Sequence, residues 1–316
     1  MSVAASPAAA PTRWTSLRLR RSAAAPGDTL AAYLFLAPWL VGLIGLTIGP
    51  ILVSLYLSFT EYSLLSPPRW IGLDNFRRMF TQDPRFWRSV QATALYVALS
   101  VPTILVFSLG LALILNRGSR LLPTYRVLIY LPSLMGTSVA VAILWRQVFG
   151  REGLFNAFLS LFGATPTSWI GSPSTALYTL VALSVWAFGS TMVIFLAALR
   201  QIPAELHEAA AIDGAGAIAR FRHITLPALS PITFFNTIMV TVHSFQAFTP
   251  AYIVSQGSGG PADSTLLYAL YLYDKGFRQF EMGYASAMAW LMLIALAVVT
   301  GLIFASSRYW VHYGER

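Results

Sequence analysis

Long uncharged stretches alternate along the chain with short segments that carry the charged residues. A helix that crosses a hydrocarbon core about 30 Å thick needs about 20 apolar residues. One buried charge in such a helix costs roughly 2.5–3.5 kcal/mol, so an uncharged stretch is the primary signal of a span. The pattern predicts an all-α integral membrane protein with six transmembrane helices, at about 30–57, 88–115, 127–148, 174–199, 228–254 and 282–306.

The stretch between Glu152 and Arg200 holds 47 uncharged residues, too many for one helix. Glycine and proline residues between positions 163 and 173 interrupt it, and both residue types break helices. We therefore expect a short interfacial helix at 154–162 before the fourth span, and we favour six spans over seven or eight. A second short helix is expected at 74–80, where Phe76, Met79 and Phe80 share one helical face.

The composition narrows the class of protein. Hydrophobic residues make up 56% of the chain and charged residues 10%, whereas soluble domains carry about 25% charge. The mean hydropathy of +0.64 argues against a cytosolic enzyme. The net charge of +9 comes from basic residues spread between apolar stretches, where they meet anionic lipid rather than nucleic acid. The chain has no cysteine, which excludes disulfides, thiolate nucleophiles and cysteine-ligated metals.

With six spans, both termini lie on the same side of the membrane. Twelve of the 21 basic residues fall on that side, four of them just before the first span. We therefore expect both termini to be cytoplasmic and the chain to lie in the cell inner (plasma) membrane. Residues 1–29 are predicted to be a basic, disordered arm and residues 30–316 one six-helix transmembrane domain. The first span is too long for a cleaved signal peptide.

The sequence lacks the residues that several classes of protein function need. The single lysine, Lys275, precedes Gly276, and no phosphate-binding loop is present for ATP. The six expected spans contain no aspartate or glutamate, which proton- or sodium-coupled carriers usually keep at mid-membrane. The four histidines do not have the spacing of a zinc hydrolase. We expect no catalytic residue, no metal and no cofactor in this chain.

The loop at 200–227, between the fourth and fifth spans, has a pattern of helix, turn and helix. Residues 204–212 are helix formers, Pro203 suits a first turn, and Asp213-Gly214 ends the helix. Residues 215–221 can resume it. Small side chains and the carboxylate of Glu208 suit close contact with another protein. A hairpin that packs on its own helix bundle is the alternative.

This loop resembles a known motif. The run Glu208-Ala209-Ala210-Ala211-Ile212-Asp213-Gly214-Ala215-Gly216, with Leu226-Pro227 after it, resembles the EAA motif of permease subunits of binding-protein-dependent ABC importers. Runs outside the loop resemble the carbohydrate branch of that family, with the maltose-type and glycerol-phosphate-type permeases as nearest relatives. These runs are Gly72-Leu73-Asp74-Asn75-Phe76, Leu131-Pro132, Gly259-Gly260-Pro261 and Met282-Gly283-Tyr284-Ala285-Ser286-Ala287. Only the basic amino-terminal arm is outside the similarity.

The resemblance implies the fold of a type I ABC importer permease that carries a sugar or oligosaccharide. It implies that a cytoplasmic helix-turn-helix couples the spans to an ATPase through Glu208, Ala209, Ala210, Asp213, Gly214, Ala215 and Gly216. The implied partners are a second homologous permease, two ATP-binding cassette subunits and an extracytoplasmic solute-binding protein. ATP and Mg²⁺ would be bound by the ATP-binding cassette subunits and not by this chain.

Two further groups of residues are candidates for contact with the binding protein and the sugar. The outer loops would receive the binding protein through Arg77, Arg78, Arg151, Asp263 and Asp274, unless these are ordinary solvated charges. A sugar path needs hydrogen-bonding side chains and flat aromatic faces. The spans offer His243, Gln246, Ser244, Asn236, Ser190, Trp186 and Trp290. Hydrogen bonds between helices and simple packing are the alternatives for this second group.

Other functions stay open at this point. A stand-alone secondary carrier or channel would need no ATPase partner, and an intramembrane enzyme would need a nucleophile or metal cluster. An importer of this family could also carry a polyol, a sugar phosphate or another solute that is not a carbohydrate.

Overall fold

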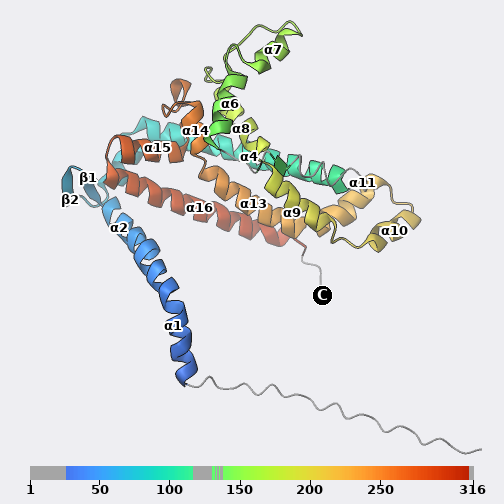
Figure 1. The fold of residues 1–316 in the computed structure, drawn as a ribbon, viewed down its shortest axis with the longest axis horizontal. Coiled ribbons are helices and arrows are strands. Elements are labelled where there is room, and N and C mark those ends of the chain that lie inside the picture. The colour runs from blue at the N-terminus through green and yellow to red at the C-terminus, as the bar shows by residue number, and fades with distance from the viewer. Residues whose placement is uncertain (1–25, 117–129, 132, 134, 136–137, 313–316) are drawn as a thin grey trace, which may run out of the picture. The chain divides into compact units, whose positions relative to one another are not determined.

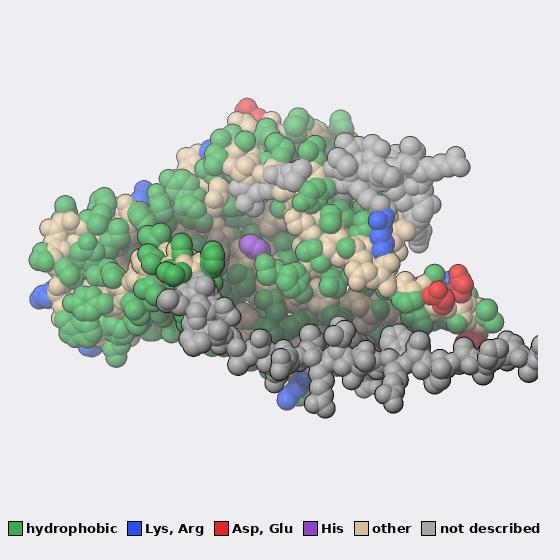
Figure 2. Space-filling view, turned by 60° about the horizontal axis from the view of Figure 1, so that its bottom comes forward, with side chains coloured by type: hydrophobic (Ala, Val, Ile, Leu, Met, Phe, Trp, Pro, Cys, Tyr) green, Lys and Arg blue, Asp and Glu red, His purple; other side chains and the backbone are tan. Residues whose placement is uncertain are grey.

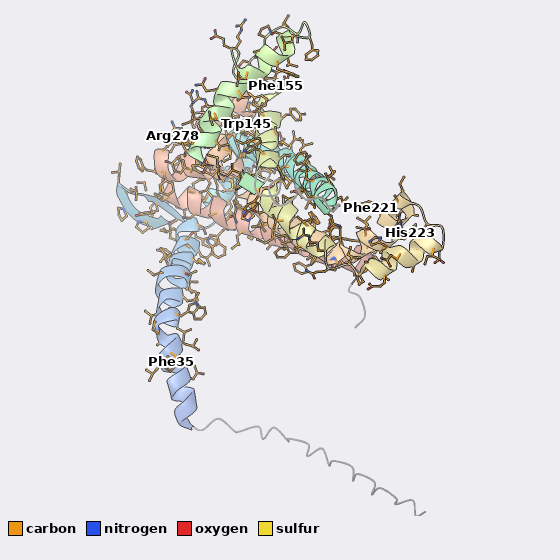
Figure 3. All side chains as sticks on the ribbon, turned by 45° about the vertical axis from the view of Figure 1, so that its right-hand side comes forward. Phe35, Trp145, Phe155, Phe221, His223 and Arg278 are labelled. Carbon is orange, nitrogen blue, oxygen red and sulfur yellow. The ribbon has the colours of Figure 1, made fainter. Side chains whose placement is uncertain are left out.

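The computed structural model describes residues 26–116, 130, 131, 133, 135 and 138–312. It is mostly helical, and it divides into a first unit up to Val53 and a second unit from Ser54. The first unit contains α1 (Pro26–Gly42), the π-helical turn η1 (Leu43–Ile48) and the start of α2 (Gly49–Ser58). Its large apolar side chains are mostly exposed, for example Phe35 in Figure 3. A helix that is apolar on all sides is suited to lipid or to another protein.

The second unit begins with a small antiparallel hairpin and continues as helices. In chain order they are β1 (Thr60–Ser63), β2 (Ser66–Trp70), α3 (Asp74–Thr81), α4 (Pro84–Asn116), α6 (Val139–Phe149), α7 (Leu154–Ser160), α8 (Ala176–Trp186), α9 (Gly189–Leu199), α10 (Ala204–Ile212), α11 (Ala217–Arg220), η2 (Phe221–Thr225), α12 (Leu226–Ala228), α13 (Ser230–Phe245), α14 (Thr249–Val254), η3 (Pro261–Asp263), α15 (Tyr268–Tyr273), η4 (Asp274–Arg278) and α16 (Met282–Trp310). In this unit, β1, β2 and α15 lie at one end of the long helices and α10 and α11 at the other (Figure 1). We call these the hairpin end and the α10 end.

The long helix α4 is the centre of the second unit. Small side chains recur on its buried face, at Ser89, Ala92, Ser100, Ser108 and Ala112. Small residues let helix backbones approach closely where no hydrophobic effect drives them together. Helix α4 packs in this way against α8, α9, α13 and α15.

Two apolar clusters form the core of this unit. The cluster at the hairpin end contains Phe86, Tyr96, Tyr271 and Tyr284 among its members. The cluster at the α10 end contains Met192, Phe195, Leu196, Leu199 and Leu229, together with Ala112 and Leu115 from α4. Elsewhere, hydrophobic side chains cover most of the described surface seen in Figure 2, and charged side chains are sparse. Such a surface is expected where lipid or a partner protein covers it.

The expected fourth span is broken in the middle. Helices α8 and α9 meet at a bend of 45°, with Ala187 and Phe188 between them. The carbonyl oxygen of Phe188 accepts from the backbone N–H of Met192 at 3.0 Å and also from the Ser108 hydroxyl at 3.2 Å, so α4 is bonded to the backbone at the break. Gly189 follows at a close approach to Tyr130 and Ser133, where a β-carbon would overlap the Ser133 side chain.

Three described helices are long and apolar enough to cross a membrane: Tyr33–Ser58, Pro84–Asn116 and Met282–Trp310. The number rises to five if each of two bent pairs is one span, α8 with α9 and Ala217–Ala228 with Ser230–Val254. The expected third span at 127–148 lies partly outside the described residues, and its described part includes most of α6. Most of the expected basic arm, residues 1–25, also lies outside them.

The two short helices expected beside the spans are present as α3 and α7. The β1–β2 hairpin is not anticipated by the sequence analysis. It pairs Thr60 with Trp70 and Glu61 with Arg69. The buried Asn75 amide of α3 donates to the carbonyl oxygens of Ser58 and Thr60, at 3.0 and 2.9 Å. These bonds connect α3 to the end of α2 and the start of the hairpin.

Candidate coupling loop and translocation surface

Helix α10 and the turn after it form a closed local motif. The helix begins after Pro203 and ends at Asp213, as the helix formers and the Asp-Gly break predict. Gly214 has φ of +81°, a left-handed conformation that a residue without Cβ adopts at little cost. The backbone N–H of Ala215 donates to the carbonyl of Ala210 at 2.8 Å, and that of Gly214 to Ala211 at 3.1 Å. This pair of bonds is the Schellman motif, which satisfies carbonyls at a helix end.

The motif is largely solvent-exposed. No residue of α10 is buried, and two isoleucines on either side of the turn, Ile212 and Ile218, are 87% and 84% exposed. Glu208 is exposed as well, one turn before Ile212. Figure 3 places Phe221 and His223, which follow α11, at this same end. Two short helices that display largely exposed isoleucines beside one turn have the features of a surface that another protein covers.

The structure brings the seven expected coupling residues together within this motif. Glu208, Ala209 and Ala210 lie on α10, and Asp213 and Gly214 form the turn. Ala215 and Gly216 connect the turn to α11. Ala204, His207 and Glu208 of α10 line a surface pocket together with Leu113 and Asn116 of α4. The start of α10 thus lies beside its own bundle, and the alternative of a hairpin packed on that bundle stays open.

The expected path residues separate into two groups. His243 and Gln246 are exposed on α13 and the turn after it, on the same side as the exposed Phe235 and Met239. Asn236 and Ser244 instead face the interior, and the Ser100 hydroxyl of α4 donates to the Ser244 hydroxyl at 3.3 Å. Ser244 thus connects two helices.

The remaining path candidates lie on α8, α9 and α16. Trp186 is 44% exposed and its ring lies 6.2 Å from that of Trp145 on α6. Ser190 is exposed at the start of α9, and Trp290 is half-buried in α16. Tyr178 and Trp186 are exposed on α8, and Ser190 is exposed on α9, beyond the bend between the two helices.

The five docking candidates also differ in their surroundings. Arg78 pairs with Glu281 at 3.0 Å, and Asp263 pairs with Arg85 and Arg88 at 2.9 and 3.1 Å. Asp274 is buried and pairs with Arg278 at 3.1 Å. Arg77 and Arg151 are exposed and have no ion pair within the described part of the chain. The latter two are therefore the ones with charge available to a partner.

The structure contains a polar cluster at the hairpin end that the sequence analysis does not predict. Asp83 accepts hydrogen bonds from the hydroxyls of Tyr271 and Tyr284 at 2.5 and 2.7 Å. Its other carboxylate oxygen accepts from the backbone N–H groups of Arg85 and Phe86, which caps α4. Burial opposes ionisation of this carboxyl, but the hydrogen bonds from the two tyrosines and the Phe86 backbone, together with the charge of Lys275, outweigh burial, so the pKa of Asp83 lies below its ordinary value.

The buried Lys275 extends this cluster. Its ammonium group donates to Gln279 at 3.0 Å and lies 3.4 Å from a Glu281 carboxylate oxygen. It also lies over the ring of Tyr284, 5.2 Å from the ring centre. Because the partners of Asp83 are about 190 to 200 residues away in sequence, no local pattern reveals this cluster.

Among the residues that the structure describes, no group of three or more histidine, aspartate or glutamate side chains is arranged to hold a metal ion.

Comparison with known proteins shows which family these features belong to. Residues 81–311 match the model of the family described as binding-protein-dependent transport system inner membrane component. The chain belongs to this family. It is therefore an inner-membrane permease component of such a transport system.

Curated relatives and a solved structure agree with this assignment. The chain is 50% identical over 299 residues to the probable ABC transporter permease protein YesP of Bacillus subtilis, covering 94% of this chain and 97% of YesP. It is 33% identical over 282 residues to the lactose transport system permease protein LacF of Rhizobium radiobacter, covering 87% and 93%. A chain of the bacterial alginate ABC transporter, solved in complex with an alginate pentasaccharide-bound periplasmic protein, has the same fold. The TM-score is 0.79 at 21% identity, covering 92% and 98% of the two chains.

The first prediction concerns the turn of the α10 motif. Replacing Gly214 by Ala places a β-carbon at positive φ, which costs about 1 kcal/mol and should speed local hydrogen exchange over residues 208–216 about fivefold. Gly216→Ala is the matched control, because Gly216 has φ of −66° and open space around it. Hydrogen–deuterium exchange of the isolated permease in detergent measures both. Equal exchange in the two variants would show that the turn geometry is wrong.

The second prediction concerns Asp83. Asp83→Ala removes the acceptor of two hydroxyls and two backbone N–H groups and should lower the free energy of unfolding by about 1–3 kcal/mol. Asp74→Ala is the control, because Asp74 is exposed in the first turn of α3. Thermal unfolding in detergent, followed by intrinsic tryptophan fluorescence, compares them. A melting temperature for Asp83→Ala equal to that of the control contradicts the cluster.

Proposed function

We propose that this permease forms, with a second homologous permease, the membrane path of an ATP-driven importer for a sugar or oligosaccharide. A solute-binding protein delivers the sugar, and two separate ATPase subunits bind ATP and Mg²⁺. The relative LacF is named as the permease of a lactose transport system, and the alginate transporter was solved with a pentasaccharide-bound periplasmic protein. These two relatives support a saccharide as the cargo.

The observation that carries the proposal is the exposed α10 motif in a chain of this family. Glu208, the small residues after it and the two exposed isoleucines form a compact, largely exposed knob at the end of the bundle. A knob of this size fits a cleft on an ATPase subunit, with Glu208 paired to a basic residue there. The ATPase would act on the spans through this contact.

The proposal includes an orientation. The α10 end faces the cytoplasm, together with both termini, and the hairpin end faces outward, with six crossings in total. The excess of basic residues on the side of the termini supports this orientation. Arg77 and Arg151, the two docking candidates without an intramolecular ion pair, then lie on the outer side, where a binding protein would arrive.

The coupling step is a change in population between two arrangements of the spans. ATP binding brings the ATPase subunits together, moves the docked α10 motifs and shifts the spans from an inward-open to an outward-open cavity. The shift can be only as large as the difference between the contacts of the α10 motif in the two states. In the open cavity, the sugar would pass His243, Gln246, Trp186 and Ser190, which are exposed or partly exposed in this chain.

The third prediction tests the partner of the α10 motif. Tagged wild-type permease is purified from native membranes in mild detergent, and the accompanying chains are identified by mass spectrometry. We expect an ATPase with a phosphate-binding loop and a second permease. Glu208→Ala and Ile212→Glu should both reduce the recovery of the ATPase. The reduction for Ile212→Glu should be about tenfold, because a charge replaces an apolar side chain that the ATPase would bury.

Leu65→Glu is the matched control for this experiment. Leu65 is 92% exposed in the turn of the hairpin, away from the α10 motif. The amount of ATPase recovered with the Leu65→Glu permease should therefore equal that recovered with wild type. The proposal is wrong if wild type is recovered without an ATPase. It is also wrong if Ile212→Glu retains the ATPase as well as the control does.

A further inference from the structure

A narrow apolar pocket opens between α4 and α16 at the hairpin end. Its volume is about 260 Å³, and its wall includes Trp87 and Ala94 of α4 and Leu291 and Ala295 of α16. Phe80 of α3 lines it as well. Helices α4 and α16 pack against α13 and α15 rather than closely against each other, so direct packing of the two helices does not fill the space between them.

The pocket is elongated along the two helices, both of which are long and apolar enough to cross a membrane. Arg88 marks the membrane surface on α4, because no charged residue follows it until Arg117. Trp87 lies at this level, whereas Ala94 lies about 9 Å deeper, at a rise of about 1.5 Å per residue. Ala295 lies about 20 Å beyond the start of α16. Each headgroup region of a bilayer is only about 5–8 Å thick, so the pocket reaches the hydrocarbon.

Every polar side chain in the wall of the pocket already has a partner within the chain. The Thr93 hydroxyl oxygen accepts from the backbone N–H of Tyr268 at 2.7 Å, and the Tyr268 hydroxyl donates to the carbonyl oxygen of Met288 at 2.8 Å. The Trp87 indole N–H donates to the carbonyl oxygen of Phe80 at 3.1 Å. A polar ligand therefore finds no free group to bond. An engineered apolar cavity of about 150 Å³ likewise stays dry and binds benzene.

Large side chains line the pocket, in contrast to the small-residue face through which α4 meets its neighbouring helices. The rings of Phe80, Phe86 and Trp87 pack on one another, with centroids 5.5 to 6.0 Å apart. Leu291 and Met292 face them from α16. Close contacts between transmembrane helices use small residues instead. Aromatic side chains are enriched at membrane interfaces, and methionine adapts to irregular apolar partners, so this wall suits a flexible apolar chain better than a second helix.

We infer that the pocket holds one acyl chain of a membrane phospholipid. The chain descends from the leaflet at the hairpin end, passes the rings of Phe80 and Trp87 and fills the space between α4 and α16. The inference rests on the membrane location that the family shows, and not on the proposed cargo or partners. A large side chain from a helix of a second permease is the competing occupant.

Two alanines of the wall allow the pocket to be filled by substitution. Ala295→Phe places a ring in it from α16. Ala297→Phe is the matched control, because Ala297 is exposed on the same helix but about 200° around it. Ala94→Leu fills the pocket from α4 and serves as a second variant if the ring disturbs α16. Each chain is purified in detergent with its accompanying subunits and is washed free of lipid.

Dioleoylphosphatidylglycerol is then titrated, and its binding to the permease is measured by native mass spectrometry. Ala295→Phe and Ala94→Leu should weaken the tightest binding by about tenfold, because excluding about two methylene groups from an apolar wall costs that factor. Ala297→Phe should bind as wild type does. Dihexanoylphosphatidylglycerol, which has the same headgroup on short chains, should bind wild type at least about tenfold more weakly.

The inference is overturned if both filled variants bind the long-chain lipid as tightly as the control does. Equal binding of the short-chain and long-chain lipids by wild type would place the interaction in the headgroup and also overturn it. Loss of a second permease from the filled variants, with lipid binding unchanged, would identify a protein side chain as the occupant. None of these results depends on recovery of the ATPase or on sugar uptake, so the inference and the proposed function fail separately.

Discussion

Close packing on the small-residue face of α4 is the interaction on which the rest of the second unit depends. Of the described helices, α4 alone contributes buried residues to both apolar clusters. Its serines and alanines let α8, α9 and α13 come close, and two of its hydroxyls bond to neighbouring helices, at Phe188 and Ser244. Larger side chains there would separate the helices and expose the backbone at the α8–α9 break. In lipid, an exposed backbone group has no water to bond.

The two ends of the bundle contrast in how many partners their charged groups have. At the hairpin end, Asp83, Lys275, Glu281 and Asp274 bind groups from α3, α4, η4 and α16, so this end is held by many polar contacts. At the α10 end, a closed helical motif displays two largely exposed isoleucines and a carboxylate that has no ion pair among the described residues. In an importer, this asymmetry would let an ATPase act at one end while the other keeps its shape for a binding protein.

The features that follow from local sequence are predictable. Helix α10 occupies the expected residues because the helix formers, a proline at its start and a glycine after its end all lie within twelve consecutive residues. Helix α3 is predicted from the shared helical face of Phe76, Met79 and Phe80, and α7 from the glycine and proline residues that follow it. The identification of the α10 motif as a coupling loop instead rests on its resemblance to a family, because helix, turn and exposure alone do not name the partner.

Features that depend on packing between distant segments are not predictable in this way. The break at Phe188 has no proline to signal it, and the Ser108 hydroxyl that bonds to its backbone lies 80 residues earlier in the chain. Asn236 and Ser244 have the same polar character as His243, yet the rotation of α13 against α4 places them inside and His243 outside. Asp83 looks like an ordinary loop carboxylate until Tyr271 and Tyr284 are brought to it by the fold.

The most direct test of the account is sugar uptake by proteoliposomes. One set contains the assembly purified through a tag on this chain, with its binding protein, and the other contains this chain alone. The account predicts uptake only by the assembly, and only when ATP and the binding protein are both present. Uptake by the chain alone, without ATP, would contradict the account and show that the protein is a stand-alone carrier.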